Sequence, residues 1–298
     1  MSKLGFGIDG GGTRSRLCVF DLETGAELGR FMGGSTNMYS VGAEAAFANI
    51  EALLRSSGFV LTDFQKGCLG SAGLSRPNEQ KLYSEFFFRL LPQCQMYLCN
   101  DGEILLVGGL ESLEGYSLIG GTGSFALARA ADGATARAGG LGYMLGDEGS
   151  ALWIAWEGIK RSLRSMEGRD LDTCLLPLMV EHFKLETPTD FVGLMHQRFQ
   201  KAEIAAAARI VLDHTETDLL AKDIAEKAVE ELALLVRSVV KQMPLKQKRV
   251  ALSGGVIENN EFIRQGLIKV LQREYPDMDF VMGPGDAVMG ACMLARSI

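Results

Sequence analysis

The stretch LGFGIDGGGTRSRLCVFD, residues 4–21, decides the fold that this sequence predicts. An apolar run ends at Asp9, three glycines follow, and a second apolar run leads away. We therefore expect two antiparallel strands joined by a tight glycine turn. The pattern returns as YSLIGGTGSFALARA, residues 116–130, which begins 112 positions after residue 4. The same hairpin at the start of each half of the chain predicts a duplicated domain.

The rest of the chain alternates between predicted strands and helices. After the first hairpin we expect a strand at 27–34, a helix at 41–57, a strand at 66–72, a helix at 78–91 and a strand at 95–99. Beyond the second hairpin we expect mostly helix at 150–242, a strand at 249–253, a helix at 258–275, a strand at 279–283 and a helix at 286–298. This alternation predicts an α/β architecture.

Composition and charge limit the classes of function. The chain has 298 residues, 47% hydrophobic and 22% charged, with a formal net charge of -7. The length suggests one large domain or two. Acidic charge spread along the chain argues against a nucleic-acid or anionic-membrane partner, since both need clustered Lys and Arg. The N-terminal sequence leaves no room for a signal peptide, and no apolar run approaches the roughly 20 residues of a membrane span, so we expect a cytoplasmic protein.

The cysteines and histidines form no recognisable catalytic or metal-binding motif. The six cysteines form no CxxC pair, and we interpret them as reduced thiols that mostly fill the core. The three histidines, His182, His196 and His214, lie in a charged helical stretch, and we interpret them as surface or helix-face residues. A zinc site or a Ser-His-Asp triad is therefore not expected, and a carboxylate is the better candidate for a general base.

Glycine is unusually frequent, with 36 Gly beside only 7 Pro. Between two strands, glycines 10–12 would let backbone N–H groups approach an anion closely, and Thr13 would add a hydroxyl donor. Asp9 is suited to holding Mg²⁺ beside phosphates, directly or through water. The alternative is a structural hairpin that needs positive φ at its turn, with Asp9 as a turn residue. Neither glycine turn matches a P-loop or a Rossmann dinucleotide motif.

Five blocks of sequence, in this order, form a family pattern: DGGGTRSRLCVFD, CNDGE, LIGGTGSFALAR, GGLGYMLGDEGSALWIA and LSGGV. They resemble the sugar kinase, actin and heat-shock ATPase superfamily, and more closely the N-acetylglucosamine kinase branch of the BadF/BadG/BcrA/BcrD ATPase family. The resemblance spans essentially the whole chain, and residues 139–155 are its most specific block. It implies two ribonuclease H-like (actin-like ATPase) domains that flank a cleft, residues 1–117 with the C-terminal helix 286–298, and residues 118–285.

The resemblance also implies roles for individual residues, with ATP and Mg²⁺ as cofactors. ATP would bind at three glycine turns, formed by Gly11, Gly12, Thr13, Gly121, Thr122, Gly123, Gly254 and Gly255. The sugar would bind to side chains and to bare backbone, at Asn37, Asp101, Gly140, Leu141, Gly142 and Asp147. Mg²⁺ would lie near Asp9.

Asp101 would be the catalytic base. Phosphoryl transfer to an alcohol needs two aligned oxygens and a carboxylate that accepts the hydroxyl proton. Asp101 follows an apolar strand and precedes Gly102, so it can stand in a cleft with little competing bulk. Without the surrounding blocks, Asn-Asp-Gly would also suit an ordinary surface turn.

Other interpretations concern residues after the second hairpin. Asp147 and Glu148 could form a paired-carboxylate glycosidase site, but adjacent loop residues rarely face one ligand, and glycosidase carboxyl groups lie about 5 to 10 Å apart. We expect Asp147 to bind sugar and Glu148 to support it. Trp153 and Trp156 are interpreted as helix core rather than as a platform on which a sugar stacks.

The predicted function is ATP-dependent phosphorylation of an amino sugar, N-acetylglucosamine to N-acetylglucosamine 6-phosphate. Glucosamine, N-acetylmannosamine and N-acetylmuramic acid stay open as acceptors. An ATPase activator of a 2-hydroxyacyl-CoA dehydratase, which holds an iron–sulfur cluster on cysteines, and a non-catalytic sugar or ATP sensor are the alternatives. Homodimers are common among the resembling kinases, and the sequence does not demonstrate one here.

Overall fold

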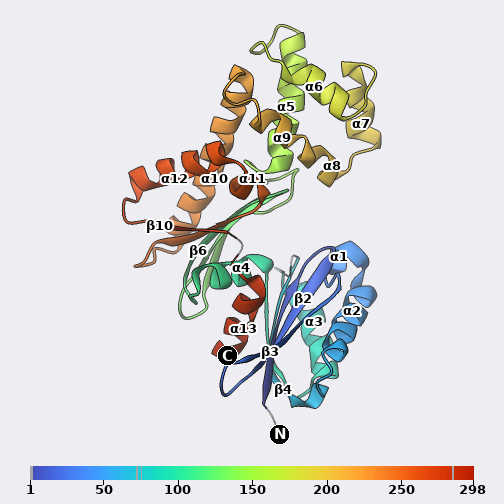
Figure 1. Ribbon diagram of the computed structural model, residues 1–298, viewed down its shortest axis with the longest axis vertical. Coiled ribbons are helices and arrows are strands. Elements are labelled where there is room, and N and C mark those ends of the chain that lie inside the picture. The colour runs from blue at the N-terminus through green and yellow to red at the C-terminus, as the bar shows by residue number, and fades with distance from the viewer. Residues whose placement is uncertain (1–2, 72, 75, 284) are drawn as a thin grey trace. The chain divides into compact units, whose positions relative to one another are not determined.

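The computed structural model describes residues 3–71, 73–74, 76–283 and 285–298. The chain forms two compact units (Figure 1). The first unit comprises Met1–Ser117, Arg129–Ala134 and Gly283–Ile298, and the second comprises Leu118–Ala128 and Thr135–Met282. Each is built around a five-stranded sheet with helices, so the predicted α/β architecture is confirmed. Ala72, the last residue of the strand expected at 66–72, lies outside the described residues.

The sheet of the first unit has the order β3-β2-β1-β4-β5. Its strands are β1 (Leu4–Gly10), β2 (Arg14–Asp21), β3 (Glu27–Gly34), β4 (Phe64–Ser71) and β5 (Gln95–Cys99). β1, β2 and β3 run antiparallel, whereas β4 and β5 run parallel to β1. The helices are α1 (Met38–Val41), α2 (Ala43–Ser56), α3 (Pro77–Leu90), α4 (Asp101–Leu110) and α13 (Ala287–Ser297), with a short 3-10 turn, η1 (Leu61–Asp63).

The alternation of apolar residues and glycine in β1 explains how this sheet packs. Leu4, Phe6 and Ile8 belong to one buried cluster with residues of α2 and α3. Gly7 points to the other face, where a Cβ would lie 2.6 Å from the backbone nitrogen of Cys292 in α13. The strand therefore supplies bulk to one layer of helices and close backbone contact to the other.

Helix α4 was not predicted from the sequence, where no helix or strand was expected over residues 103–115. Its sequence, DGEILLVGGL, has no polar stripe, and the helix is correspondingly buried, with one side packed against α13. A Cβ on Gly290 of α13 would lie 2.0 Å from the carbonyl oxygen of Ile104. Amphipathic periodicity is the main sequence signal for a helix, and a helix buried all round does not show it.

The second sheet has the order β10-β9-β6-β7-β8. Its strands are β6 (Gly115–Gly120), β7 (Ser124–Arg129), β8 (Thr135–Gly139), β9 (Arg249–Ser253) and β10 (Asp279–Met282). The helices of the second unit are α5 (Ala151–Met166), α6 (Leu175–His182), α7 (Phe191–Gln197), α8 (Lys201–Ala206), α9 (Ala208–Leu212), α10 (Leu219–Gln242), α11 (Gly255–Asn259) and α12 (Glu261–Glu274), with a 3-10 turn, η2 (Pro188–Asp190). The expected helical region at 150–242 is thus present as α5 to α10, and α10 packs on β8, α5 and α12.

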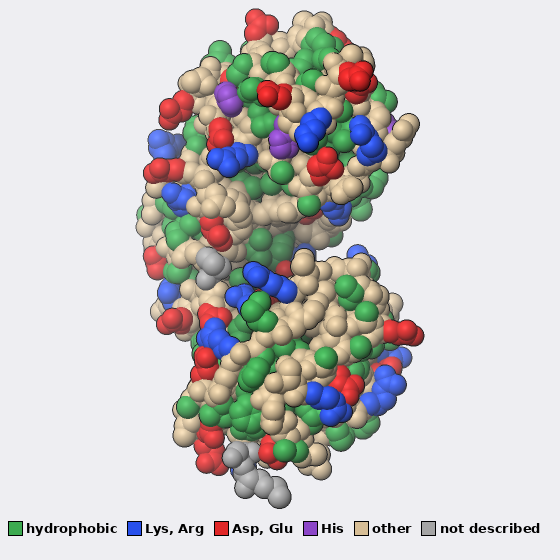
Figure 2. Space-filling model, turned by 45° about the vertical axis from the view of Figure 1, so that its right-hand side comes forward, with side chains coloured by type: hydrophobic (Ala, Val, Ile, Leu, Met, Phe, Trp, Pro, Cys, Tyr) green, Lys and Arg blue, Asp and Glu red, His purple; other side chains and the backbone are tan. Residues whose placement is uncertain are grey.

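The surface agrees with a mixed charge pattern. On the face drawn in Figure 2, acidic and basic side chains are interspersed rather than separated by sign. None of the described helices is both long enough and apolar enough to cross a membrane.

Candidate active site

The first glycine turn joins β1 to β2 and is held from one side by residues 35–37. The Ser35 hydroxyl donates to the carbonyl oxygen of Gly11 at 3.0 Å. A Cβ on Gly10 would lie 2.2 Å from the Thr36 hydroxyl oxygen, so this contact requires glycine. Gly12 and Thr13 are exposed at the tip of the turn, and their N–H and hydroxyl groups can meet an anion there.

Asn37 stands directly after this supporting segment. Its side-chain oxygen accepts a hydrogen bond from the backbone nitrogen of Tyr39 at 2.9 Å and so caps α1. The cap fixes the orientation of the amide group, whose nitrogen can donate to a sugar hydroxyl. The structure therefore brings Asn37 and the first glycine turn together in one unit.

Asp101 reaches the same edge of the first sheet through strand register. Asp9 of β1 pairs with Gly70 of β4, and Gly70 pairs with Cys99 of β5. Because these strands are parallel, their carboxyl ends meet at one edge. Asp101 begins α4 two residues after Cys99, and its Oδ1 accepts from the backbone nitrogen of Gly102 at 3.1 Å. A negatively charged group at a helix N-terminus also interacts favourably with the helix dipole.

Asp9 is engaged in an ion pair within the hairpin. Nε and Nη2 of Arg16 both contact its Oδ2, at 3.1 and 2.7 Å. Oδ1 of Asp9 is then the oxygen that could coordinate a cation. Among the described residues no three His, Cys, Asp or Glu side chains converge as a metal cage. A site with one carboxylate fits Mg²⁺, which often takes one or two carboxylates and completes its shell with phosphates and water.

The second glycine turn joins β6 to β7 and is packed against the turn after β9. The carbonyl oxygen of Gly121 accepts from the backbone nitrogen of Ala151 at 2.8 Å, which joins the turn to the start of α5. Gly254 has φ +97, and a Cβ there would lie 2.5 Å from the carbonyl carbon and oxygen of Gly120. The two glycine turns are therefore in backbone contact, and only glycine at position 254 permits it.

A cavity of about 820 Å³ opens at this contact, within the second unit, and its wall includes the expected Gly121, Thr122 and Gly255. Further lining residues, which were not predicted from the sequence, include Ala202, Ala205, Ala206, Ala208, Arg209, Leu212, Asp213, Asn259 and Asn260. The run AEIAAAAR, residues 202–209, was the available signal, because consecutive small side chains leave room for a flat ring. The volume falls within the usual range of about 300 to 1,000 Å³ for ligand pockets.

Asp147 lies against the second glycine turn. A Cβ on Gly123 would approach the Asp147 carboxylate to 3.0 Å, and the backbone nitrogen of Ser124 lies 3.4 Å from Oδ1. Burial raises the pKa of Asp147 above its usual value, while the Ser124 N–H and the charge of Lys201 act in the opposite direction. Asp147 has φ +64, a conformation that non-glycine residues rarely adopt and that is often found at functional sites.

The loop that precedes Asp147 exposes backbone and apolar side chains. Gly139, Gly140 and Gly142 all have positive φ. The backbone nitrogen of Gly140 donates to the carbonyl oxygen of Ser124 at 2.9 Å, and Leu141 is 71% exposed. Glu148 contacts the turn through its carbonyl oxygen, which accepts from the Ser124 hydroxyl at 2.6 Å.

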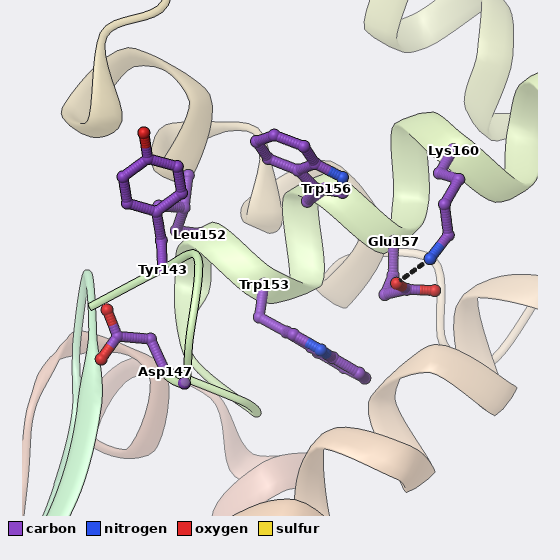
Figure 3. A pocket seen from close by; sticks show the side chains of 8 residues that line it. Tyr143, Asp147, Leu152, Trp153, Trp156, Glu157 and Lys160 are labelled. Carbon is purple, nitrogen blue, oxygen red and sulfur yellow. Dashed lines mark hydrogen bonds and ion pairs between the residues drawn. The ribbon is translucent and has the colours of Figure 1, made fainter. Parts of the chain in front are cut away.

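The interpretation of Trp153 and Trp156 as helix core is wrong. Both indoles line a pocket of about 190 Å³ together with Tyr143, Asp147 and Glu157 (Figure 3). Trp156 is 36% exposed, and Trp153 is half-buried. Both tryptophans line this pocket because loop 143–147 leaves that face of α5 open.

Comparison with known proteins identifies the family. The model of the BadF/BadG/BcrA/BcrD ATPase family matches residues 6–295. The chain belongs to this family. It is 32% identical to the N-acetylmuramic acid/N-acetylglucosamine kinase of Clostridium acetobutylicum over 302 residues, which cover 99% of both chains. It is 28% identical to the N-acetyl-D-glucosamine kinase of Dictyostelium discoideum, over 99% of this chain and 98% of that protein.

Solved structures agree on the fold of this member of the BadF/BadG/BcrA/BcrD ATPase family. A crystal structure of a Chromobacterium violaceum protein aligns with a TM-score of 0.74 at 24% identity, over 99% of both chains. A ROK family glucokinase from Streptomyces griseus, in complex with glucose and AMPPNP, aligns with a TM-score of 0.55 at 16% identity, over 99% of this chain and 100% of that chain. The actin-like fold implied by the sequence blocks is confirmed.

Proposed function

We propose that this protein transfers the γ-phosphoryl group of ATP to the 6-hydroxyl group of N-acetylglucosamine. The observation on which the proposal rests is 32% identity, over 99% of both chains, to a kinase named for N-acetylmuramic acid and N-acetylglucosamine. A second relative, similar over nearly the whole chain, is named for N-acetyl-D-glucosamine alone. N-acetylglucosamine, which both names share, is therefore the first acceptor to test, and N-acetylmuramic acid is the second.

In this proposal Asp101 is the general base. Its carboxylate accepts the proton of the acceptor hydroxyl as that oxygen bonds to the γ-phosphorus and the bond from phosphorus to the ADP oxygen breaks. Support comes from its place at the carboxyl ends of three parallel strands, the edge that also bears the first glycine turn. A carboxylate at a strand end, on the first residue of a helix, is held in a fixed orientation.

The other proposed residues bind and orient. The turns formed by Gly11, Gly12, Thr13, Gly121, Thr122 and Gly123 would bind phosphate oxygens, and Gly254 and Gly255 would pack against the adenosine. Mg²⁺, when bound beside Asp9, would neutralise charge on the phosphates. The sugar would be held by Asn37, Asp101 and Asp147 and by the backbone of Gly140, Leu141 and Gly142.

The pocket beside the second glycine turn supports the adenosine assignment. Its alanine-rich wall suits the faces of a purine ring, and the side chains of Asn259 and Asn260 offer donors and acceptors for its edge. We also propose that the protein works in the cytoplasm, in keeping with its reduced cysteines, and forms a homodimer, as is common among the resembling kinases. Light scattering on the purified protein gives its mass in solution and checks the dimer.

The activator alternative gains no support from the cysteines. Cys18, Cys68, Cys99 and Cys292 are buried in the first unit, and Cys174 is exposed in the second. An iron–sulfur cluster shared by two subunits needs thiols that converge at one surface. The described cysteines do not have that arrangement.

The experiment is an acceptor panel with the purified protein, ATP and Mg²⁺. N-acetylglucosamine, glucosamine, N-acetylmannosamine, N-acetylmuramic acid and glucose are each tested for ATP consumption, and ³¹P NMR locates the phosphate on the product. The proposal predicts N-acetylglucosamine 6-phosphate as a major product. ATP hydrolysis that no sugar accelerates would instead favour an ATPase that is not a kinase.

A further inference from the structure

Apart from Asp147, the residues of the pocket that Trp153 and Trp156 line have no role in the proposed transfer. It lies between loop 143–147 and α5, and Trp153, Trp156, Glu157 and Lys160 follow one another at helical spacing along one face (Figure 3). Its volume is about 190 Å³. Since a protein cavity of about 150 Å³ is known to hold benzene, this pocket can hold one six-membered ring.

The chemistry of the lining suits a carbohydrate. The aromatic rings form a supported wall, because Tyr143 stacks on Phe199 with centroids 5.0 Å apart and Trp156 meets the edge of Phe199 at 5.8 Å. The carboxylate of Glu157, bonded to the ammonium group of Lys160, supplies polar partners, and Asp147 also lines the pocket. Apolar faces with a few convergent charged groups match a pyranose, which has an apolar C–H face and hydroxyls at its edge.

The pocket extends beyond the place expected for the sugar ring that is phosphorylated. Ala151 at the start of α5 donates to Gly121 in the second glycine turn. Lys160 is nine residues further, or about 14 Å along the helix axis. A single hexose that presents its 6-hydroxyl near the phosphate turn does not extend along the whole of this face, whereas a second ring linked to it does.

We propose that this pocket is a second carbohydrate subsite, which holds the pyranose ring linked to the acceptor amino sugar. Asp147 lines this pocket and is also the proposed ligand of the acceptor, so the two positions are adjacent and a disaccharide can occupy both. The protein then binds amino-sugar disaccharides more tightly than the monosaccharide. The inference rests on the proposed function, because it takes Asp147 as a ligand of the acceptor.

The sequence supplies a direct probe of the subsite. The chain contains only two tryptophans, and both line this pocket, so the whole tryptophan emission of the protein reports on it. Titration without ATP compares N-acetylglucosamine with its β-1,4-linked disaccharide, N,N′-diacetylchitobiose. The disaccharide is expected to shift the emission and to bind with the lower Kd. The single-tryptophan variants Trp153→Phe and Trp156→Phe assign the signal to each indole.

Two variants and a control test the contacts. Trp156→Ala removes a wall, and Glu157→Gln keeps its shape but removes charge. Each should reduce the preference for the disaccharide, the ratio of the monosaccharide Kd to the disaccharide Kd, by about fivefold, as expected for the loss of one aromatic contact or one hydrogen bond. Phe88→Ala, which truncates a 73% exposed aromatic residue on α3, should leave that ratio unchanged.

Three results would overturn the subsite. The disaccharide leaves the emission unchanged at concentrations where the monosaccharide binds, or the preference survives Trp156→Ala, or the monosaccharide alone gives the full shift and loses its affinity in Trp156→Ala. The last result would make the pocket the site of the acceptor ring itself. The acceptor panel tests the proposed function separately. A protein that binds the disaccharide but phosphorylates no sugar would contradict kinase activity and leave the subsite standing.

Discussion

Nε of Arg129 donates a hydrogen bond to the Glu103 carboxylate at 2.8 Å, and the two side chains are only 4% and 5% exposed. The Tyr97 hydroxyl donates to the same carboxylate at 2.5 Å. Burial and the negative charge of Glu103 raise the pKa of Tyr97. Because Glu103 lies on the first turn of α4, two residues after Asp101, this buried pair fixes the start of the helix that presents the proposed base.

Removing one member of the pair should destabilise the first unit. Arg129→Met leaves the Glu103 carboxylate buried without its cation, which typically costs about 3 to 5 kcal/mol. The double variant Glu103→Gln with Arg129→Met should recover part of this loss, because no uncompensated charge remains. Urea denaturation followed by circular dichroism measures both. Equal stability of the single and double variants would show that the charge pair is not coupled.

Asp101→Asn should reduce turnover by about 100-fold to 10,000-fold, the usual contribution of a general base. The amide keeps the size of the side chain but cannot accept the hydroxyl proton. Binding of a non-hydrolysable ATP analogue, measured by calorimetry, should stay within about twofold of wild type. Turnover close to wild type would remove Asp101 from the role of base.

Gly254→Ala should damage nucleotide binding and stability together. The new Cβ would meet the carbonyl group of Gly120 at 2.5 Å, and the backbone there has φ +97, where a side chain adds strain of about 1 to 3 kcal/mol. Gly193→Ala is the control, since nothing lies within 4 Å of its Cβ position and it stands inside α7. Thermal unfolding and the Kd for the ATP analogue should separate the two variants clearly.

Asp147→Asn should stabilise the sugar-free protein at pH 7 while weakening sugar binding. With its pKa raised by burial, Asp147 keeps its proton in the folded state at pH values where the unfolded chain has lost it. Stability therefore falls as the pH rises from about 4 through the raised pKa, and the penalty persists above it. Asn carries no such charge and tolerates the left-handed conformation at φ +64.

The checking measurement is the difference in Tm between Asp147→Asn and wild type across pH. The difference should be positive at pH 7 and should shrink towards pH 4. A constant difference, or a less stable variant at pH 7, would contradict the buried-charge argument. The KM for N-acetylglucosamine should rise about tenfold or more if Asp147 is a sugar ligand, since a hydroxyl partner would be lost.

Asp9→Asn should raise the Mg²⁺ concentration needed for half-maximal turnover by about 10-fold to 100-fold. Arg16→Gln is the matched control, because it breaks the same ion pair but keeps the carboxylate. Arg16 is 47% exposed, and such a pair contributes only about 0 to 1 kcal/mol to stability. A similar Mg²⁺ requirement in both variants would assign the effect to the ion pair rather than to the metal.

The sequence by itself determined the strands of both sheets except β8 (Thr135–Gly139), together with the two glycine turns and the order of the family blocks. Short apolar runs such as residues 4–8 and 249–253 predict a buried strand from the local sequence alone, whatever the strand later packs against. The close backbone approaches at Gly10 and Gly254 could also be expected from the local sequence, because a residue without a side chain allows such an approach wherever it occurs. The proposed roles of the glycine, Asn and Asp residues stay predictions.

Only the tertiary structure decided what lies across space from those turns. Alanines of segment 202–208 line the same pocket as Gly121 and Gly255 although they lie far from both along the chain, and no local pattern specifies that arrangement. Helix α4 escaped notice because burial on all sides removes the polar stripe that marks a helix. Trp153 and Trp156 show the converse, since their spacing fixes a helix face but only the packing of loop 143–147 determines whether that face is sealed or left as a pocket.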